Sequence, residues 1–592
     1  MKDLSRTWDL ETIFPGGSRS PQLEAYLTAI EDDVRGLSKR VQAEPLAGAV
    51  EWAAFLDEVQ VVMRRLRQSG AFVSCLNAQD VQDKQARIVG GRVKQLQAAL
   101  ATVLTRLDQR MLQVPQIYWD ELLRSEALRP LAYNLDERRL RAREMLPPEE
   151  EALVNDLSVD GYHAWSDLYD ATTGRMTIPI EENGRITRVS PGQAQNRLYD
   201  DPDPRARAAA MTRWEEAWAD EADFCGLALN HLAGYRLSLY RHRGWDSVLK
   251  EPLRNNRMSA ESLEAMWVAV EEARERLVAF LAAKQKVLGL DRLGWQDVAS
   301  PIGKVERRVS YDEAARFVIE QFGRFSPRMA GFATIAFTDR WIESEDRPGK
   351  RMGGFCTSFP DKRQSRIFVT FSGTPAGVAT LAHELGHGFH QWVVNQMPAM
   401  TQQYAMNVAE TASTFAEMIV ADAAVRNAPS PQERLVLVED KLQRAVSLLM
   451  NIHARFLFET RFYEERRRGI VGAQRLNELM VQAQKDAFGG ALDLYHPHFW
   501  ASKLHFYDTR VPFYNFPYTF GFLFSAGVYA RALEAGPGFE DPYAELLRDT
   551  GRMRVEDLAW RHLGVDLQKP EFWRKAVDAV LGDLGEFLRA AG

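Results

Sequence analysis

The 592-residue chain has few cysteines and no excess of basic residues. Its three cysteines, Cys75, Cys225 and Cys356, lie far apart in the sequence and form no CxxC pair. A disulfide framework is therefore excluded, and a reducing compartment is expected. Lysine and arginine total 74 against 81 acidic residues, which gives a formal net charge of −7. No nucleic-acid partner is expected, because general nucleic-acid binding needs a basic surplus.

Long hydrophobic runs are also absent, and no signal-peptide pattern is expected from the first residues. No stretch approaches about 18 consecutive apolar residues, so no membrane span is expected. The first residues, MKDLSRTWDLETIFPGG, lack the apolar core and the cleavage site of a signal peptide. Because hydrophobic residues make up 46% and charged residues 26% of the chain, the composition is that of a globular protein. We expect a cytoplasmic location.

The sequence is instead rich in amphipathic helical patterns. Apolar residues recur at helical spacing in segments 22–43, 86–113, 205–240, 259–287, 312–322, 432–469 and 570–590. Strand signals are few: residues 177–189 predict a small hairpin around Asn183-Gly184, and residues 367–371 predict one further strand. The sequence therefore predicts a mainly α fold.

One short motif carries the chemistry. Residues 383–387 read His-Glu-Leu-Gly-His. His383 and His387 would share one helix face about 6 Å apart along the axis, a separation that suits two imidazoles binding one zinc ion. Glu384 is placed to deprotonate a water molecule at that ion. Composition alone predicts such a motif about 0.03 times in this chain, although motif matches can be false positives.

The surroundings of the motif fit a helix. Thr374 is a good N-cap and is followed by proline at the first helical position, so the helix is expected to run from there to about Gln396. The alternative is a buried helix whose histidines are satisfied by hydrogen bonds.

The third metal ligand is not a nearby histidine. His390 lies about 10.5 Å along the axis from His383, so we expect it in the core or behind a ligand. The longer motif with a third histidine would need it at position 393, which is Val393. A carboxylate on a following helix, predicted over residues 402–425, remains the best candidate.

Glu410 and Glu417 share one face of that predicted helix. A solvated acidic face is the alternative interpretation. However, no lysine or arginine occurs from Ile367 to Val425, where the composition predicts about seven and where an exposed helix normally mixes charges. A buried segment with a few isolated acids suits a bound cation. We predict Glu410 as the third ligand and Glu417 as support for a ligand histidine.

Two flanking segments contribute further candidates. Residues 353–359 and the predicted strand precede the metal helix, and an edge strand there could pair with an extended peptide, unless it only packs in the sheet. Residues 505–524 hold nine aromatic residues, most of which core packing explains. The polar groups of this segment can stabilise an oxyanion at a zinc site; they belong to His505, Tyr507, Tyr514 and Tyr518.

These residues resemble a known family. The strings GGFCTSFP, FSGTPAGVATLAHELGHGFH, VAETASTFAE and PFYNFPYTFG, with WSDLYDATTGRM and LNHLAGYRLSLYRHRGWDSVLKEPLRNNRMS upstream, are similar to the M3 family of zinc metallopeptidases, in its oligoendopeptidase F branch. The resemblance implies a mainly α, two-lobed fold that encloses a deep substrate channel, with a small sheet beside the metal helix. The lobes are expected at 1–200 and 201–592, and the substrates are oligopeptides.

The resemblance also implies roles for single residues. One zinc ion would be bound by His383, His387 and Glu410, with Glu384 as the general base. The scissile carbonyl would be contacted by a histidine and tyrosines, for which His505, Tyr514 and Tyr518 are the candidates. Gly521 occupies the position of a third tyrosine in a related branch, so the main oxyanion donor stays open.

Two other functions are compatible with the motif. A zinc aminopeptidase would place its glutamate ligand 19 residues after the second histidine and carry a GxMEN motif, whereas here the spacing is 23. A helical scaffold with a structural metal would not need Glu384, and a closed structural site would need a fourth protein ligand.

Overall fold

The computed structural model describes residues 3–592 except 44–45, 47 and 183–184. The described chain is mainly helical, as predicted, with two small sheets. It divides into two compact units. The first comprises 1–144, 306–424 and 531–564, and the second comprises 145–305, 425–530 and 565–592. These units interleave along the sequence, and the predicted lobes 1–200 and 201–592 stay a prediction.

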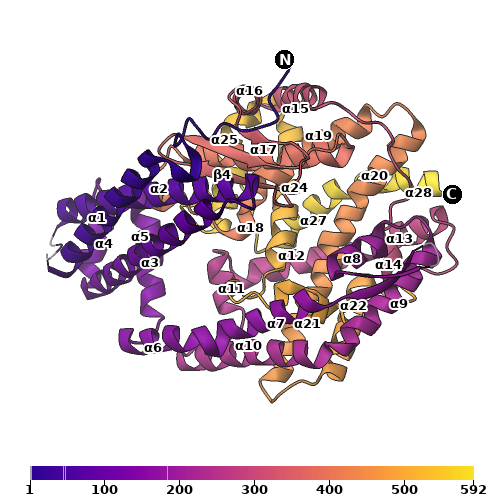
Figure 1. Cartoon of the computed structure of the whole chain (residues 1–592), viewed down its shortest axis with the longest axis horizontal. Helices are drawn as coiled ribbons and strands as arrows, with labels where there is room; N and C mark the ends of the chain where they lie inside the picture. The colour runs from indigo at the N-terminus through magenta and orange to yellow at the C-terminus, as the bar shows by residue number, and fades with distance from the viewer. Residues whose placement is uncertain (1–2, 44–45, 47, 183–184) are drawn as a thin grey trace. The chain divides into compact units, whose positions relative to one another are not determined.

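The first unit begins with a group of long helices. Figure 1 shows α1 (Pro21–Ala43), α2 (Ala49–Gln79) and α3 (Lys84–Gln113) side by side in indigo. Their facing apolar stripes form one core, in which Ile30, Phe55 and Leu107 are fully buried. The predictions for 22–43 and 86–113 are confirmed by α1 and α3. Sequence reasoning missed α2, because its buried residues include Gln60, Gln68 and Ser69 and so blur the apolar pattern.

A three-stranded sheet follows in the same unit. The strands β3 (Ile342–Glu343), β4 (Phe355–Phe359) and β5 (Gln364–Phe368) have the order β3-β5-β4, with β3 parallel and β4 antiparallel to β5. The predicted strand at 367–371 therefore begins earlier, at Gln364. Its first half is polar but buried, because the Arg366 guanidinium donates hydrogen bonds to the carbonyl oxygen of Asp9 at 2.7 and 3.0 Å.

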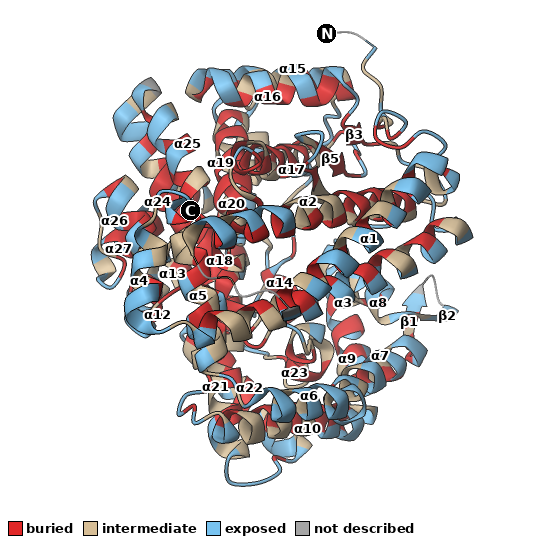
Figure 2. Ribbon diagram, turned by 90° about the vertical axis from the view of Figure 1, so that its left-hand side faces the viewer, coloured by how far each residue is buried: buried red, intermediate tan, exposed pale blue. Residues whose placement is uncertain are grey.

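The helix with the His-Glu-Leu-Gly-His motif packs on this sheet. It is α17 (Pro375–Val394), which contacts β4 and β5 and is largely buried in Figure 2. The Thr374 hydroxyl caps it by accepting the Gly377 N–H at 3.0 Å, as predicted. The single helix predicted over 402–425 is wrong, because the chain forms α18 (Met406–Ala409) and α19 (Thr411–Arg426) with a break at Glu410. The remaining helices of this unit are α4 (Gln116–Arg124), α5 (Ala132–Arg143), α15 (Tyr311–Phe325), α16 (Pro327–Thr338), α25 (Glu540–Asp549) and α26 (Val555–Leu563).

The second unit is helical apart from one hairpin. Its strands are β1 (Ile178–Glu182) and β2 (Arg185–Val189), and the turn predicted at Asn183-Gly184 lies outside the described residues. Its helices are α6 (Pro148–Ser158), α7 (Ala164–Arg175), α8 (Pro191–Asp200), α9 (Pro204–Asp220), α10 (Ala222–His242), α11 (Lys250–Asn255), α12 (Ala260–Glu272), α13 (Arg274–Val287), α14 (Trp295–Val298), α20 (Pro431–Ala445), α21 (Ile452–Arg466), α22 (Ala473–Phe488), α23 (Phe499–Ser502), α24 (Phe516–Ala535, which continues into the first unit), α27 (Pro570–Val580) and α28 (Leu584–Ala591). Several predicted long helices are pairs, as at the break between α12 and α13. In the described part of the chain no helix is long and apolar enough to cross a membrane.

Candidate metal centre

Two histidines of α17 face the break before α19. The rings of His383 and His387 lie 4.9 Å apart between centroids and at 84° to each other. Gly386, between them, lets the backbones meet, because a Cβ atom there would lie 2.4 Å from the Ala412 carbonyl oxygen. The helix-to-helix approach therefore depends on glycine at this position of the motif, and it brings the start of α19 to the histidines.

The carboxylate of Glu410 completes a three-residue group. Its Oε2 atom lies 3.3 Å from His383 Nε2 and 3.5 Å from His387 Nε2. Among the described residues this is the one group whose ligand atoms could hold a metal ion, all within 4.8 Å of one another. The Ser413 hydroxyl donates to Glu410 Oε2 at 2.7 Å, which orients the carboxylate at the helix break. Sequence reasoning missed Ser413, although a serine three residues after a ligand at a helix start is a recognisable capping pattern.

Glu417 lies behind one of the histidines. Its Oε2 atom is 3.1 Å from His383 Nδ1, so the ring can donate through Nδ1 and present the lone pair of Nε2 to a metal. Burial lowers the pKa of His387 to about 4, and the opposing charge of Glu410 does not offset it. The His387 ring can therefore act as a neutral ligand at neutral pH. Two imidazoles and one carboxylate with an open side fit a catalytic metal ion.

Glu384 is buried beside this group. Its side chain is 7% exposed, and its Oε2 atom has no hydrogen-bond partner in the described part of the chain. Gly354, just before β4, makes room for it, since a Cβ atom there would lie 3.0 Å from Glu384 Oε1. Burial raises the pKa of Glu384 to about 7, with His383 opposing and Glu410 adding to the shift. A carboxylate with such a pKa can exchange protons near neutral pH.

His390 is part of the core rather than of the metal group. Its Nε2 atom is 2.9 Å from the Thr550 hydroxyl, and its ring stacks on Tyr404 at 4.1 Å. The side chain is fully buried. This placement agrees with the expectation that His390 is not the third ligand.

The aromatic candidates lie in the second unit, in a cluster of their own. His505 is in a short 3-10 turn and Tyr514 precedes α24; their rings are 5.0 Å apart. Tyr518, in the first turn of α24, is 5.9 Å from Tyr514. The segment is anchored from α21, whose Arg455 donates to Asn515 Oδ1 at 2.9 Å. The rings of these three residues therefore lie close to one another. Their predicted contact with a scissile carbonyl stays a prediction.

Comparison with protein families gives two matches. The model of "Peptidase family M3" matches residues 328–579, which include the whole metal group, and the model of "Oligopeptidase F" matches residues 110–178. Together the two matches span slightly more than half of the chain.

Known proteins resemble the chain over nearly its full length. An "Oligoendopeptidase F homolog" of Lactococcus lactis subsp. lactis is 20% identical over 98% of this chain and 96% of its own. "Oligopeptidase PepF" of Bacillus subtilis is 22% identical over 95% and 84%, respectively. Among solved structures, a putative peptidase from Chlamydophila abortus has a TM-score of 0.85 at 17% identity, covering 99% of this chain and 98% of that one. Oligoendopeptidase-F from Enterococcus faecium has a TM-score of 0.70 at 17% identity, with 96% and 98% covered.

Proposed function

The chain belongs to peptidase family M3, and on this premise we propose that it is a zinc-dependent endopeptidase that hydrolyses internal bonds of short peptides. Membership of this family implies peptide hydrolysis. The proposal adds the metal, the general base and the preference for internal bonds. The single observation that carries it is the buried Glu384 carboxylate, with an unpaired oxygen, next to a group of two histidines and a glutamate.

The metal would be held by His383, His387 and Glu410. The chemistry supplied by bound zinc is polarisation of the scissile carbonyl and a lowered pKa of a water molecule. Glu417 supports the site by fixing the ring orientation of His383 through Nδ1.

Glu384 would move the proton in this reaction. Its Oε2 atom accepts a proton from the attacking water and then passes it to the nitrogen of the departing amine. The buried position keeps bulk water from competing for this carboxylate. Because burial is the main cause that raises the pKa of Glu384 to about 7, and a bound dication would lower it, the group would be ionised at neutral pH when the metal is present.

The peptidase proposal is tested with a short peptide blocked at both ends. Wild-type protein should cleave it internally, as product masses will show. Glu384→Gln should lose at least about 10³-fold in kcat/KM, because the amide cannot accept the proton. The zinc content, measured by atomic emission, should stay at that of the wild type.

Each other outcome has a defined meaning. Substantial cleavage by Glu384→Gln would remove Glu384 as the base. Cleavage only when the N-terminus is unblocked would indicate an aminopeptidase. If zinc-containing wild-type protein cleaves neither the blocked nor the unblocked peptide, the remaining interpretation is a helical scaffold with a structural metal.

The oxyanion donor is identified by single substitutions. Tyr514→Phe, Tyr518→Phe and His505→Ala are compared, and loss of the main donor should lower kcat by about 10²–10³-fold with little change in KM. Tyr507→Phe is the matched control, because the Tyr507 ring is buried and stacked on Tyr169 at 3.6 Å. If none of the three variants differs from this control, the proposed role of the aromatic segment is wrong.

A further inference from the structure

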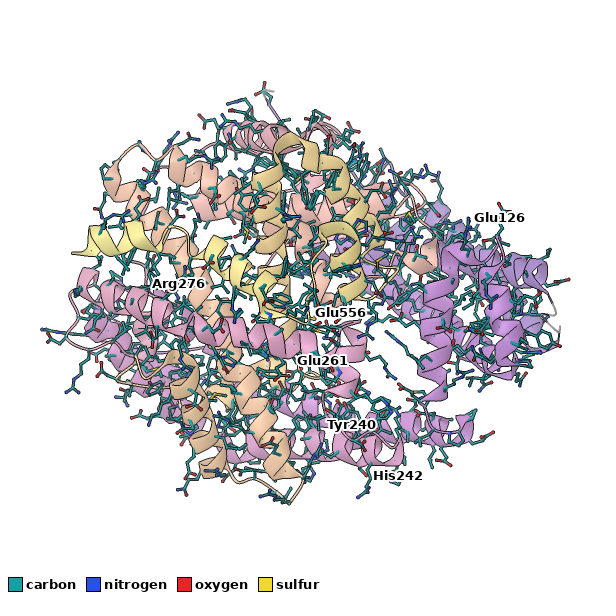
Figure 3. All side chains as sticks on the ribbon, turned by 180° about the vertical axis from the view of Figure 1, so that it is seen from behind. Glu126, Tyr240, His242, Glu261, Arg276 and Glu556 are labelled. Carbon is teal, nitrogen blue, oxygen red and sulfur yellow. The ribbon has the colours of Figure 1, made fainter. Side chains whose placement is uncertain are left out.

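A cavity that contains no residue of the metal group lies within the second unit. It encloses about 670 Å³ and is lined by residues of α10, of the end of α21 and of the π-helical turn Val159–His163. Tyr240 and His242, labelled in Figure 3, mark the end of α10 where the cavity lies. Most small-molecule sites have volumes of about 300–1,000 Å³, so the cavity is large enough for a small ligand.

Three arginines line this cavity without carboxylate partners. Each donates its hydrogen bond to a neutral oxygen: Arg241 to the Ser238 hydroxyl at 3.3 Å, Arg466 to the Asn230 carbonyl at 3.0 Å and Arg467 to the Asp246 carbonyl at 3.0 Å. None of them forms an ion pair with a residue that the structure describes. The three guanidinium groups outnumber the one acidic residue that lines the cavity, Asp246, so the wall has a net positive charge that suits an anionic ligand.

The position of Arg466 is fixed by the fold. Its guanidinium lies against the backbone of Gly234 on α10, where a Cβ atom would be only 2.3 Å from Nη2. Glycine at 234 and the carbonyl oxygen of Asn230, one turn earlier, therefore hold the guanidinium in place. A preorganised fork of this kind loses little side-chain entropy when it binds an oxyanion.

Aromatic residues complete the wall of the cavity. Trp165 stacks on His231 with centroids 4.2 Å apart. Trp245, which also lines the cavity, has the guanidinium groups of Arg243 and Arg254 at 5.0 and 4.8 Å from its ring centroid. Gly161 contributes open backbone from a π-helical turn, a feature found frequently at functional sites.

We propose that this cavity binds a small ligand through a diphosphate or triphosphate group. A guanidinium plane matches two phosphate oxygens at once, and three such groups around one space match an anion of several charges better than a single carboxylate. The proposal does not depend on the peptidase activity or on the metal.

The test uses the full chain and inorganic pyrophosphate. Binding is measured by titration calorimetry at constant ionic strength, with ADP as a second probe that separates a free polyphosphate from a nucleotide. Wild-type protein should bind at least one of the two with one site per chain. Arg241→Gln and Arg466→Gln should each weaken the dissociation constant by about tenfold or more, because each removes a charge-assisted contact.

Arg468→Gln is the matched control, since Arg468 is exposed and adjacent to Arg467 but does not line the cavity. It should leave the dissociation constant within about twofold of the wild type, as is usual for an exposed charge. Arg241→Gln keeps the test decisive if Arg466→Gln fails to fold, because Arg241 is exposed and bonded only to a neighbouring serine. No binding of either probe, or equal binding by Arg241→Gln and Arg468→Gln, would overturn the proposal.

Discussion

The described residues include two clusters of two histidines and one glutamate, and these clusters are built in opposite ways. In the first unit, Nε2 of His383 and Nε2 of His387 face Glu410 at 3.3 and 3.5 Å. The Nδ1 atom of His383 is occupied separately, by Glu417. The ring nitrogens that face Glu410 can therefore exchange this contact for a shared cation.

In the second unit, Glu215 of α9 contacts two histidines near α23. His498 Nδ1 lies 2.5 Å from Glu215 Oε2, and His496 Nδ1 contacts Oε1 of the same carboxylate. The other ring nitrogens are also occupied: Trp214 Nε1 donates to His496 Nε2 at 3.0 Å, and Asn477 lies 3.1 Å from His498 Nε2. Three of the four ring nitrogens are within hydrogen-bond distance of protein partners, and the fourth, His496 Nδ1, is in ion-pair contact with the same carboxylate, so this cluster is closed. Residue composition alone therefore does not make a metal site; the direction of the ring nitrogens towards one shared point does.

Replacing the glutamate of each cluster should give the largest difference between the two clusters in zinc content and peptidase activity. Glu410→Ala should lose its zinc and, with it, essentially all peptidase activity, because two imidazoles alone leave the shell incomplete. Glu215→Gln should keep the zinc content and kcat/KM of the wild type. Atomic emission after dialysis and peptide cleavage measure both. A full zinc complement in Glu410→Ala would point to another ligand, and zinc loss in Glu215→Gln would remove the distinction between the clusters.

A smaller effect is expected for the glutamate behind the metal ligand. Glu417→Gln should weaken zinc binding by about 10–100-fold, because the amide polarises the His383 ring less than a carboxylate does. Saturating zinc should restore most of kcat. Competition with a chelator measures the affinity, and Asp422→Asn on the same helix is the control. Unchanged affinity in Glu417→Gln would show that Glu417 only packs against the histidine.

Glu215→Gln in the closed cluster should have the smallest effect on activity. It should, however, change how the stability of the protein depends on pH. Burial alone would raise the pKa of Glu215, but His496 and His498 outweigh it and hold that pKa at about 2, below its ordinary value of 4.5. A depressed carboxyl pKa stabilises the fold above the ordinary value, and this stabilisation is lost as the pH falls towards the lower one.

Relative to Glu215→Gln, the wild type should therefore be more stable at pH values above about 4.5. The difference should decline as the pH falls from about 4.5 towards about 2, as urea unfolding of both proteins at several pH values will measure. A difference that does not change with pH would mean that the carboxylate is not held ionised by the two histidines.

Local signals in the sequence were sufficient for the metal helix. The spacing of His383 and His387, the cap at Thr374 and the proline after it all act within one or two turns, so α17 could be predicted with nearly correct ends. The absence of basic residues around the motif also directed attention to Glu410 and Glu417. The polar strand segment at Gln364–Arg366 was not predictable, because its burial depends on Asp9, distant in sequence.

The helix break at Glu410 was not predicted from the sequence either. The sequence predicted one helix over residues 402–425, whereas the close crossing at Gly386 and the hydroxyl of Ser413 favour an interrupted one. The crossing at Gly386 is a contact between distant segments, and the Ser413 hydrogen bond is local but polar, so an apolar periodic pattern carries no information about either.

The sequence by itself determined the mainly α fold, the motif helix and the residue types of the metal group, because helix periodicity and capping are local properties. Only the tertiary structure decided which cluster of histidines and glutamate stays open and that Glu384 is buried with an unpaired oxygen. It also decided that three arginines near Gly234 meet around one cavity. These outcomes depend on which polar atoms find partners after packing, and the partners come from distant parts of the chain.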